Sequence, residues 1–350
     1  VSANQQYKPI GIKKLEEIRA TGDCEVLEIS PPYTSTLDLA PKFIEDCSPF
    51  IKPVLTVQYP ADYIATIKNG RVFSYDSCNR AVISSDNYLI EEASFQWTDA
   101  LLEPEFNMVF RVKGFSRPTK YTGRVFSMLS IGSAKYYYYH WVFSAIAKLD
   151  MLKKSGLFDQ IDYFLVPTYG FPYKYTKEYL DHFGIHEDRI INEDVEHHIQ
   201  ADLLLVCSEV MLHYHLPKWA CNFLWDSFKK SFAGKSGEKL IYIARGDAPR
   251  NRKVTNEPAL IELLKNFGFE VHLLSKLSVA EQAKLFNSAR IIVAVHGGGL
   301  TNLVYCEPGT KVLEIFPDQY VRHTYYDLCQ KKDLLYDYLL CESEGSATKL

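Results

Sequence analysis

The spacing of hydrophobic and polar residues changes at about Tyr136. Before that point, short runs alternate apolar and polar positions with a period of two, which is typical of half-buried strands. After it, apolar strands alternate with amphipathic helices, as in a parallel sheet that is covered by helices on both faces. The sequence therefore predicts an α/β fold whose N-terminal part is rich in short strands.

The N-terminal part is expected to begin with a helix over residues 13–22 and a strand over 24–30. Asn69-Gly70 separates two β-type runs, and this dipeptide predicts a tight hairpin turn. Further short strands are expected over residues 53–60, 62–68, 71–74, 81–94, 107–114 and 124–131.

The later part contains stronger helix signals. Ser278 and Glu281 form a capping box, and Gly184 closes a helix. Helices are expected over residues 136–156, 173–184, 217–234, 258–269, 278–289 and 299–309. Strands are expected over residues 161–167, 189–194, 202–210, 240–245, 270–276, 290–296 and 311–317.

A small, polar stretch near residues 230–238 is the expected domain boundary. We therefore predict an N-terminal domain over residues 1–232 and a C-terminal domain over residues 233–330. Residues 331–350 are expected to form a tail that packs back on the N-terminal domain.

The stretch VAVHGGGLTN places His296 and three glycines, Gly297, Gly298 and Gly299, between a strand and a helix. Backbone N–H groups and the dipole at a helix N-terminus favour an anion, and glycine permits positive φ and close approach to a phosphate. The stretch therefore predicts a diphosphate site, with a tight turn that binds no ligand as the alternative. It is neither a GxGxxG fingerprint nor a P-loop, so a nicotinamide enzyme is not expected.

Three arginines, Arg245, Arg250 and Arg252, follow the strand LIYIAR. They are expected at the same carboxyl edge of the sheet as the glycines, because the strands are parallel. Guanidinium groups pair with phosphate through two parallel hydrogen bonds, although a charged loop is also commonly just solvated. Two anion-favouring features at one edge make a diphosphate site the preferred interpretation.

Composition narrows the function classes further. The net charge is −4, so a general nucleic-acid partner is not expected. The eight cysteines are scattered without CxxC spacing, which predicts neither a metal site nor a disulfide framework and favours a reducing compartment. No apolar run is long enough to span a bilayer. We expect a cytoplasmic protein; peripheral membrane attachment and an anchor before Val1 stay open.

Three segments together carry a family resemblance: YYHWVFSAIAKL, RGDAPRNRKVTNE and LSVAEQAKLFNSARIIVAVHGGGLTNLVYCEPGTKVLEIFP. In this order they resemble the family 61 glycosyltransferases, which include bacterial polysaccharide enzymes, plant xylan-decorating enzymes and eukaryotic O-linked GlcNAc transferases. The resemblance extends from about Tyr136 to Pro317 and is weak before that.

The resemblance implies a GT-B-like fold, in which two Rossmann-like domains face each other across a cleft. It also implies inverting transfer of a sugar from a nucleotide sugar, most simply a UDP-sugar, to a glycan or saccharide acceptor. No cofactor and no metal are expected, because arginines and a helix N-terminus can balance the diphosphate charge. The alternatives are an inactive nucleotide- or sugar-binding protein and a GT-B-like nucleotide-sugar epimerase.

The resemblance also suggests site residues. His140 and His296 are the catalytic candidates, with His140 as the base or the group that orients the acceptor. A half-buried structural histidine is an equal alternative for His140. Donor-binding candidates are Arg245, Arg250, Arg252, Gly297, Gly298, Gly299, Asn302 and Glu314, the last expected at a strand end beside the ribose. Acceptor-side candidates are Tyr138, Tyr139 and Trp141.

The chain departs from the family motif around the first histidine. The family motif reads Asn-Tyr-Phe-His-Trp-Leu-Phe-Asp and continues to Pro-Arg. This chain has Tyr137 in place of the asparagine, Ser144 in place of the aspartate, and Ala147-Lys148 in place of Pro-Arg. The function of the aspartate in relatives therefore does not transfer to this chain.

Overall fold

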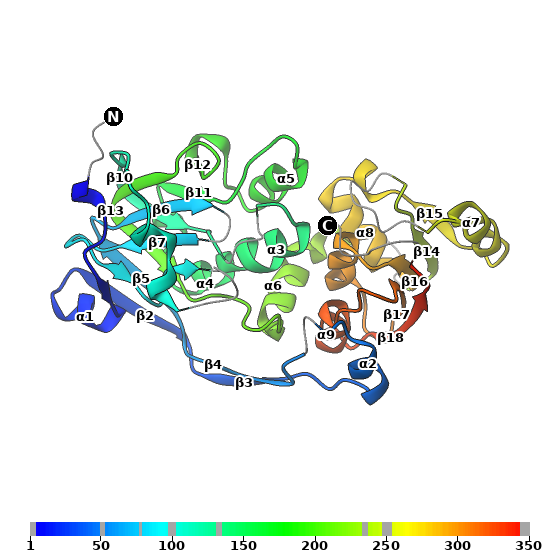
Figure 1. The fold of residues 1–350 in the computed structure, drawn as a ribbon. Coiled ribbons are helices and arrows are strands. Elements are labelled where there is room, and N and C mark those ends of the chain that lie inside the picture. The colour runs from blue at the N-terminus through cyan, green and yellow to red at the C-terminus, as the bar shows by residue number, and fades with distance from the viewer. Residues whose placement is uncertain are drawn as a thin grey trace. The chain divides into compact units, whose positions relative to one another are not determined.

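The computed structural model describes residues 5–49, 53–76, 79–96, 103–130, 135–232, 237–246 and 254–343. The chain forms two compact units, labelled by their elements in Figure 1. Unit 1 comprises Val1–Tyr33 and Tyr59–Val210, and unit 2 comprises Thr34–Gln58 and Met211–Leu350.

These units differ from the domains expected from the sequence, because the boundary lies at residue 210 rather than 232. The helix α6 (Lys218–Phe228) belongs to unit 2. Its buried Phe228 packs against Tyr305 of the same unit, with ring centroids 5.1 Å apart. Residues 34–58 also join unit 2, a long-range association that no local pattern signals.

Unit 1 is built on an 11-stranded sheet of mixed direction. Its main path is β1-β8-β7-β6-β13-β10-β11-β12, and β13 also pairs with β5. The strands β12, β11, β10 and β13 run parallel, whereas β5, β6 and β7 form the antiparallel part. The strands are β1 (Ile12–Lys13), β2 (Cys24–Ser30), β5 (Asp62–Lys68), β6 (Arg71–Asp76), β7 (Asn79–Ile83), β8 (Leu89–Ile90), β9 (Phe95–Gln96), β10 (Thr119–Ser127), β11 (Tyr163–Val166), β12 (Ile190–Asn192) and β13 (His198–Cys207).

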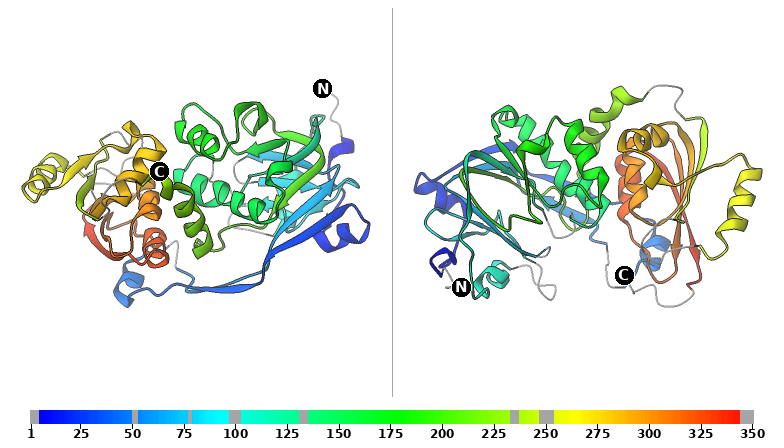
Figure 2. Two further views of the ribbon diagram at one scale, coloured as in Figure 1. Left: turned by 180° about the vertical axis from the view of Figure 1, so that it is seen from behind. Right: turned by 90° about the horizontal axis from the view of Figure 1, so that it is seen from above.

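The helices of unit 1 lie on both faces of this sheet. Leu15 and Ile18 of α1 join the hydrophobic core on one face, and α4 packs on the other, as the view from above in Figure 2 shows. The helical elements are η1 (Gln5–Tyr7), α1 (Leu15–Ala20), η2 (Pro104–Phe106), η3 (Met108–Phe110), α3 (Tyr138–His140), η4 (Trp141–Ile146), α4 (Lys148–Lys154), η5 (Phe158–Gln160), α5 (Lys174–His182) and η6 (Glu187–Arg189).

The hairpin expected at Asn69-Gly70 is wrong. Strands β5 and β6 do not pair with each other but follow one another along β13, both antiparallel to it. Asn69 has a φ of 51° and makes a kink between them. A Cβ on Gly70 would lie 2.9 Å from Leu204 Cβ, so glycine is needed for close approach to β13.

The strand expected over residues 107–114 is also wrong. This segment contains the short helix η3, whose first turn is capped by the Asn107 side chain through a 3.0 Å bond from the Val109 N–H. The Asn107 side chain accepts the hydrogen bond of a backbone N–H that would otherwise need a partner on a neighbouring strand.

Unit 2 contains a five-stranded parallel sheet in the order β15-β14-β16-β17-β18. Helix α7 lies on one face, and α8 and α9 lie on the other (Figures 1 and 2). The strands are β14 (Lys239–Ile243), β15 (Glu270–His272), β16 (Ala289–Val295), β17 (Lys311–Pro317) and β18 (Leu335–Cys341). The helices are α2 (Pro41–Asp46), α6, η7 (Lys229–Ser231), α7 (Glu257–Asn266), η8 (Leu274–Lys276), α8 (Val279–Asn287), η9 (Gly298–Tyr305) and α9 (Thr324–Lys331). A small sheet of β3 (Tyr33–Thr36) and β4 (Thr56–Tyr59) contains the first two crossings between units.

The C-terminal segment does not form the tail expected from the sequence. Residues Leu335–Cys341 form β18, which pairs with β17 along its whole length. The backbone groups of this strand are thus satisfied within unit 2. The segment is therefore the edge of the parallel sheet rather than an addition to unit 1.

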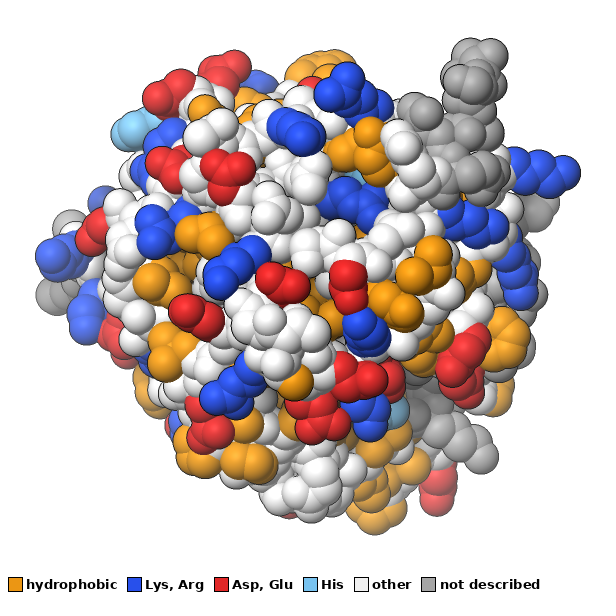
Figure 3. All heavy atoms as spheres, turned by 90° about the vertical axis from the view of Figure 1, so that its left-hand side faces the viewer, with side chains coloured by type: hydrophobic (Ala, Val, Ile, Leu, Met, Phe, Trp, Pro, Cys, Tyr) orange, Lys and Arg blue, Asp and Glu red, His pale blue; other side chains and the backbone are white. Residues whose placement is uncertain are grey.

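Charged side chains of both signs are interspersed on the face shown in Figure 3. This mixture agrees with the small net charge of −4. Within the described part of the chain, no helix is both long enough and apolar enough to span a bilayer.

Candidate functional site

The carboxyl ends of β14, β16 and β17 lie side by side at one edge of the unit 2 sheet, because these neighbouring strands are parallel. Arg245 follows β14, His296 and the three glycines follow β16, and Asp318 begins the loop after β17. In open α/β sheets, ligands bind outside the carboxyl ends of the strands.

Arg245 contacts the glycine loop directly. Its Nη1 donates to the His296 carbonyl oxygen at 3.2 Å. Its backbone N–H donates to Glu257 Oε1 at 3.1 Å, and the same oxygen accepts from Tyr242 at 2.9 Å. Glu257 thereby fixes the start of the arginine loop. Arg250 and Arg252 lie outside the described residues, so their predicted contacts stay predictions.

Glycine is needed in this loop because neighbouring side chains leave no room for a Cβ, and not because of a special backbone angle. Gly297 has an extended φ of 167°, and neither Gly298 nor Gly299 has a positive φ, so the positive φ that glycine permits is not used here. A Cβ on Gly297 would lie 1.7 Å from Arg245 Nη1. A Cβ on Gly299 would lie 2.8 Å from Leu274 Cδ1. Gly298 and Gly299 are half-buried and begin η9, which is a 3-10 helix of eight residues. The N-terminus of a helix is therefore present at this edge.

His296 is held in a cage of aromatic rings. It is only 6% exposed and stacks on Phe316, with centroids 4.9 Å apart and planes tilted by 25°. Tyr320 and Tyr325 contact the ring at centroid distances of 5.6 and 5.4 Å. The ring Nδ1 lies 2.5 Å from Glu314 Oε1. A carboxylate partner of this kind fixes the orientation of an imidazole.

The sequence led us to expect Glu314 at a strand end, and this expectation is wrong. It is the middle residue of β17, paired in register with Ala294 on one side and Tyr338 on the other. Its side chain is fully buried, and its Oε2 accepts a 2.6 Å bond from the Tyr336 hydroxyl. The structure therefore shows this carboxylate in contact with the His296 ring. The predicted contact of Glu314 with the ribose stays a prediction.

Asn302 is also fully buried. Its Nδ2 donates to Gln282 Oε1 at 2.8 Å and to the Gly299 carbonyl oxygen at 3.1 Å. These bonds tie η9 to α8 and hold the glycine turn from beneath. The structure thus shows a positioning contact for this side chain, and the predicted donor contact stays a prediction.

In unit 1, the helix expected over residues 136–156 is present as three consecutive segments, α3, η4 and α4. The middle segment η4 is a π-helix, a form that is rare and often found at functional sites. His140 lies in the first turn and is half-buried. Its Nδ1 lies 3.3 Å from the hydroxyl oxygen of Ser144, one helical turn further on.

The acceptor-side candidates divide between core and surface. Trp141 is fully buried and Tyr139 is 6% exposed, so both rings lie in the core of unit 1, and their predicted acceptor contact stays a prediction. Tyr138 is half-buried, and its hydroxyl lies 3.0 Å from that of Tyr179. Tyr136 and Tyr137, at 47% and 38% exposed, are the accessible rings of the run.

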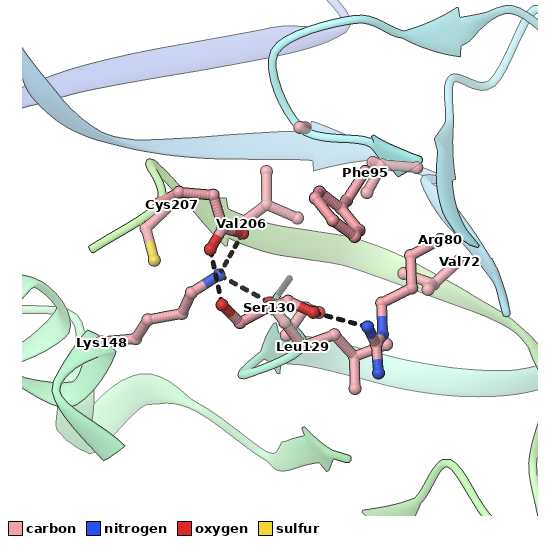
Figure 4. A pocket seen from close by; sticks show the side chains of 12 residues that line it. Val72, Arg80, Phe95, Leu129, Ser130, Lys148, Val206 and Cys207 are labelled. Atoms are coloured by element: carbon pink, nitrogen blue, oxygen red, sulfur yellow. Dashed lines mark hydrogen bonds and ion pairs between the residues drawn. The ribbon is translucent and has the colours of Figure 1, made fainter. Parts of the chain in front are cut away.

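Lys148, which stands where the family has arginine, belongs to a small internal cavity of unit 1 (Figure 4). Its Nζ donates to the Leu129 carbonyl oxygen at 2.6 Å and pairs with Glu209 at 3.1 Å. Arg80 donates to the Ser130 carbonyl oxygen across the same cavity. With a volume of about 20 Å³, the cavity has room for about one water molecule, so we assign Lys148 to the internal structure.

Sequence reasoning missed three residues of the unit 2 edge: Glu257, Tyr320 and Tyr336. Glu257 carried only a helix-start signal, and Tyr336 lay in the segment expected to be a tail. Tyr320 contacts the His296 ring and Tyr336 contacts Glu314, each across segments that are separate in the sequence. No spacing rule predicts contacts of this kind.

Fold and site together define an α/β protein whose parallel sheet presents arginine, histidine and a helix N-terminus at its carboxyl edge. This combination favours a phosphate-bearing ligand. The chain belongs to the Glycosyltransferase 61 family, whose model matches residues 138–313, about half of the chain.

Two plant proteins are similar over short segments. A "Xylan glycosyltransferase MUCI21" of Arabidopsis thaliana is 30% identical over 87 residues, which is 23% of this chain and 18% of that protein. A "Beta-1,2-xylosyltransferase RCN11" of Oryza sativa subsp. japonica is 36% identical over 64 residues, which is 18% of this chain and 12% of that protein. The matched segments thus span less than a fifth of either relative.

Proposed function

We propose that this protein is an inverting glycosyltransferase that moves a sugar from a UDP-sugar to a glycan or saccharide acceptor. The observation that carries the proposal is the contact of Arg245 with the glycine loop at the carboxyl edge of a parallel sheet. Family membership and the names of the two plant relatives support transfer to a glycan.

In the proposed reaction, a base removes the proton from an acceptor hydroxyl, and the resulting oxygen attacks the anomeric carbon of the donor. The bond from that carbon to the diphosphate oxygen breaks, and UDP leaves. Arg245 and the N-terminus of η9 stabilise the charge that develops on the diphosphate, without a metal in this proposal. His296, oriented by the contact of its Nδ1 with Glu314, contacts the donor sugar, whose hydroxyl can donate a hydrogen bond to Nε2.

His140 is the proposed base. The hydroxyl oxygen of Ser144 lies 3.3 Å from its Nδ1. A neutral imidazole is the form that accepts a proton. A GT-B-like arrangement of the two units, as the family implies, is part of this proposal.

Turnover measurements test the proposal. UDP-xylose, UDP-glucose, UDP-galactose and UDP-N-acetylglucosamine are incubated with and without xylan oligosaccharides, and UDP release is followed. We expect one donor to release UDP faster when an acceptor is present, and NMR of the product to show the inverted anomer. Donor binding without turnover with any acceptor would instead indicate a binding protein that lacks activity.

The role of His140 has a separate test. The His140→Ala variant should lose about 10²–10⁴-fold in kcat and keep its UDP affinity, because only proton transfer is removed. The surface variant His186→Ala is the control, since His186 is exposed. Near-normal turnover by the His140 variant would return this histidine to a structural role.

A further inference from the structure

The loop that follows β17 lies at the same sheet edge as the glycine loop and is firmly held. Asp318 donates its N–H to the Cys341 carbonyl oxygen at 2.9 Å, and Tyr320 donates to the Pro317 carbonyl oxygen at 3.0 Å. On its other side, the Val321 carbonyl oxygen accepts from the Ser48 N–H at 3.1 Å. This anchoring sets the direction in which the side chains of the loop leave the backbone.

Arg322 of this loop is linked to His296 through one aromatic ring. Its guanidinium carbon lies 4.6 Å from the centre of the Tyr320 ring, a cation–π contact. The Tyr320 ring in turn lies 5.6 Å from the His296 ring. Arg322 and Tyr320 are both half-buried, so each keeps a surface from which a ligand could be contacted.

One donor group of Arg322 lacks a hydrogen-bond partner among the described residues. Its Nε is buried and makes no hydrogen bond to any residue that the structure describes. A buried donor of this kind normally has a partner, and leaving it unsatisfied costs free energy. The buried Nε is out of reach of a ligand, so a ligand would contact the half-buried guanidinium through its Nη groups.

Arg322 and Arg245 come from the strands on either side of β16. The sheet order is β14-β16-β17, so the glycine loop after β16 lies between the loops that carry the two arginines. His296 contacts both loops, through its carbonyl oxygen to Arg245 and through its ring to Tyr320. Two guanidinium forks that flank a helix N-terminus match the several oxygens of a diphosphate.

We propose that Arg322 is a second arginine contact for the diphosphate of the donor nucleotide, opposite Arg245. This inference rests on the function proposed above. It assigns to the loop after β17 the positive charge that the sequence led us to seek in Arg250 and Arg252.

The test compares the affinities of UDP and uridine, measured by NMR titration of the full chain. Arg322→Ala should weaken UDP binding about 10- to 100-fold and leave uridine binding unchanged, because uridine carries no phosphate. Arg322→Lys, which keeps the charge but not the fork, should give an intermediate loss. Arg290→Ala, at an exposed position on β16, is the matched control and should bind both ligands normally.

Each outcome separates the inference from the function on which it rests. If wild-type protein binds UDP and both Arg322 variants bind it within twofold of wild type, the inference is wrong and the proposed function stands. Equal weakening of UDP and uridine binding would also overturn it, since Arg322 would then act on the base or on the fold. If wild-type protein binds no nucleoside diphosphate, the proposed function fails first.

Discussion

His296 owes its orientation to two residues behind it. A carboxylate can only accept hydrogen bonds, so the 2.5 Å contact with Glu314 requires a proton on Nδ1 of the imidazole. The Tyr336 hydroxyl, at 2.6 Å from the other carboxylate oxygen, holds Glu314 in turn. Tyr336 thus holds Glu314, and Glu314 keeps the proton of the His296 ring on Nδ1.

Glu314→Gln tests this arrangement. A glutamine amide can donate to Nδ1, which moves the ring proton to Nε2 and changes what His296 offers to a ligand. We expect kcat to fall about 10- to 100-fold, as is usual when the orienting partner of a histidine is lost. The ring-nitrogen NMR shifts of His296 should report the exchanged tautomer, and Tyr336→Phe should give a smaller loss. Unchanged kcat with the proton still on Nδ1 would contradict this role for Glu314.

Among the structural elements, the glycine loop and the arginine loop depend on each other, because Arg245 packs against Gly297 and bonds the His296 carbonyl oxygen. Gly297→Ala introduces a Cβ 1.7 Å from Arg245 Nη1 and must displace the guanidinium. We expect it to weaken UDP binding by about as much as Arg245→Ala, roughly 1–3 kcal/mol for a charged hydrogen bond. The two substitutions together should cost little more than either one, because they remove the same contact.

Gly309→Ala is the matched control for this prediction. Gly309 has a φ of 82° and nothing near its Cβ position, so alanine there strains the backbone without touching the site. It should lower thermal stability and leave UDP affinity unchanged. Additive losses in the double variant of Gly297 and Arg245, measured by calorimetry, would show that the two loops act independently.

Elements with a strong local signal could be predicted from the sequence. The capping box of Ser278 and Glu281 is present, with the Ser278 N–H bonded to Glu281 Oε2 at 2.7 Å, and β14, β16 and β17 lie where their apolar runs indicate. Features that depend on distant partners were not predictable in the same way. The pairing partner of β5 and β6 is β13, far along the chain, so the turn signal of Asn69-Gly70 was read as a hairpin.

The same distinction applies to the site. The strand-to-glycine transition and the arginine after β14 have local signatures, and the structure brings Arg245 and His296 together. The burial of Glu314 depends on β18, which supplies Tyr336 from a segment with no recognised motif. The burial of Tyr139 and Trp141 likewise depends on how their helix packs, which an aromatic run alone does not reveal.

At the scale of the whole molecule, each unit contains a buried histidine that stays neutral. Burial, with a contribution from the Arg71 guanidinium, lowers the pKa of His198 in unit 1 to about 4. Burial, with contributions from His215 and Arg322, lowers the pKa of His323 in unit 2 to about 4. His198 lies 3.2 Å from Arg71 through Nε2 and 2.8 Å from the Ser116 carbonyl oxygen through Nδ1.

Acid should therefore destabilise both units. The folded-state pKa of each histidine is below its unfolded value of 6.5, so the unfolded chain binds more protons between about pH 6.5 and 4. The contribution to the free energy of unfolding is complete above about pH 6.5 and is lost as the pH falls toward 4, by about 1.4 kcal/mol per unit of pKa difference. Urea unfolding of wild type and His198→Gln from pH 7.5 to 5 should show a flatter pH dependence in the variant. Identical slopes would contradict a neutral, buried His198.

We propose that the carboxyl edge of the unit 2 sheet holds the diphosphate of a nucleotide sugar. Thermal unfolding in the presence of UDP, GDP, ADP and CDP tests it most directly, with Arg245→Ala as the paired variant. At 10 to 100 times its Kd, UDP should stabilise the wild-type protein by about 1.4–2.7 kcal/mol and stabilise the variant less. Absence of any shift with all four diphosphates, together with a shift produced by NAD or by a divalent metal, would show that this edge does not hold a nucleotide diphosphate.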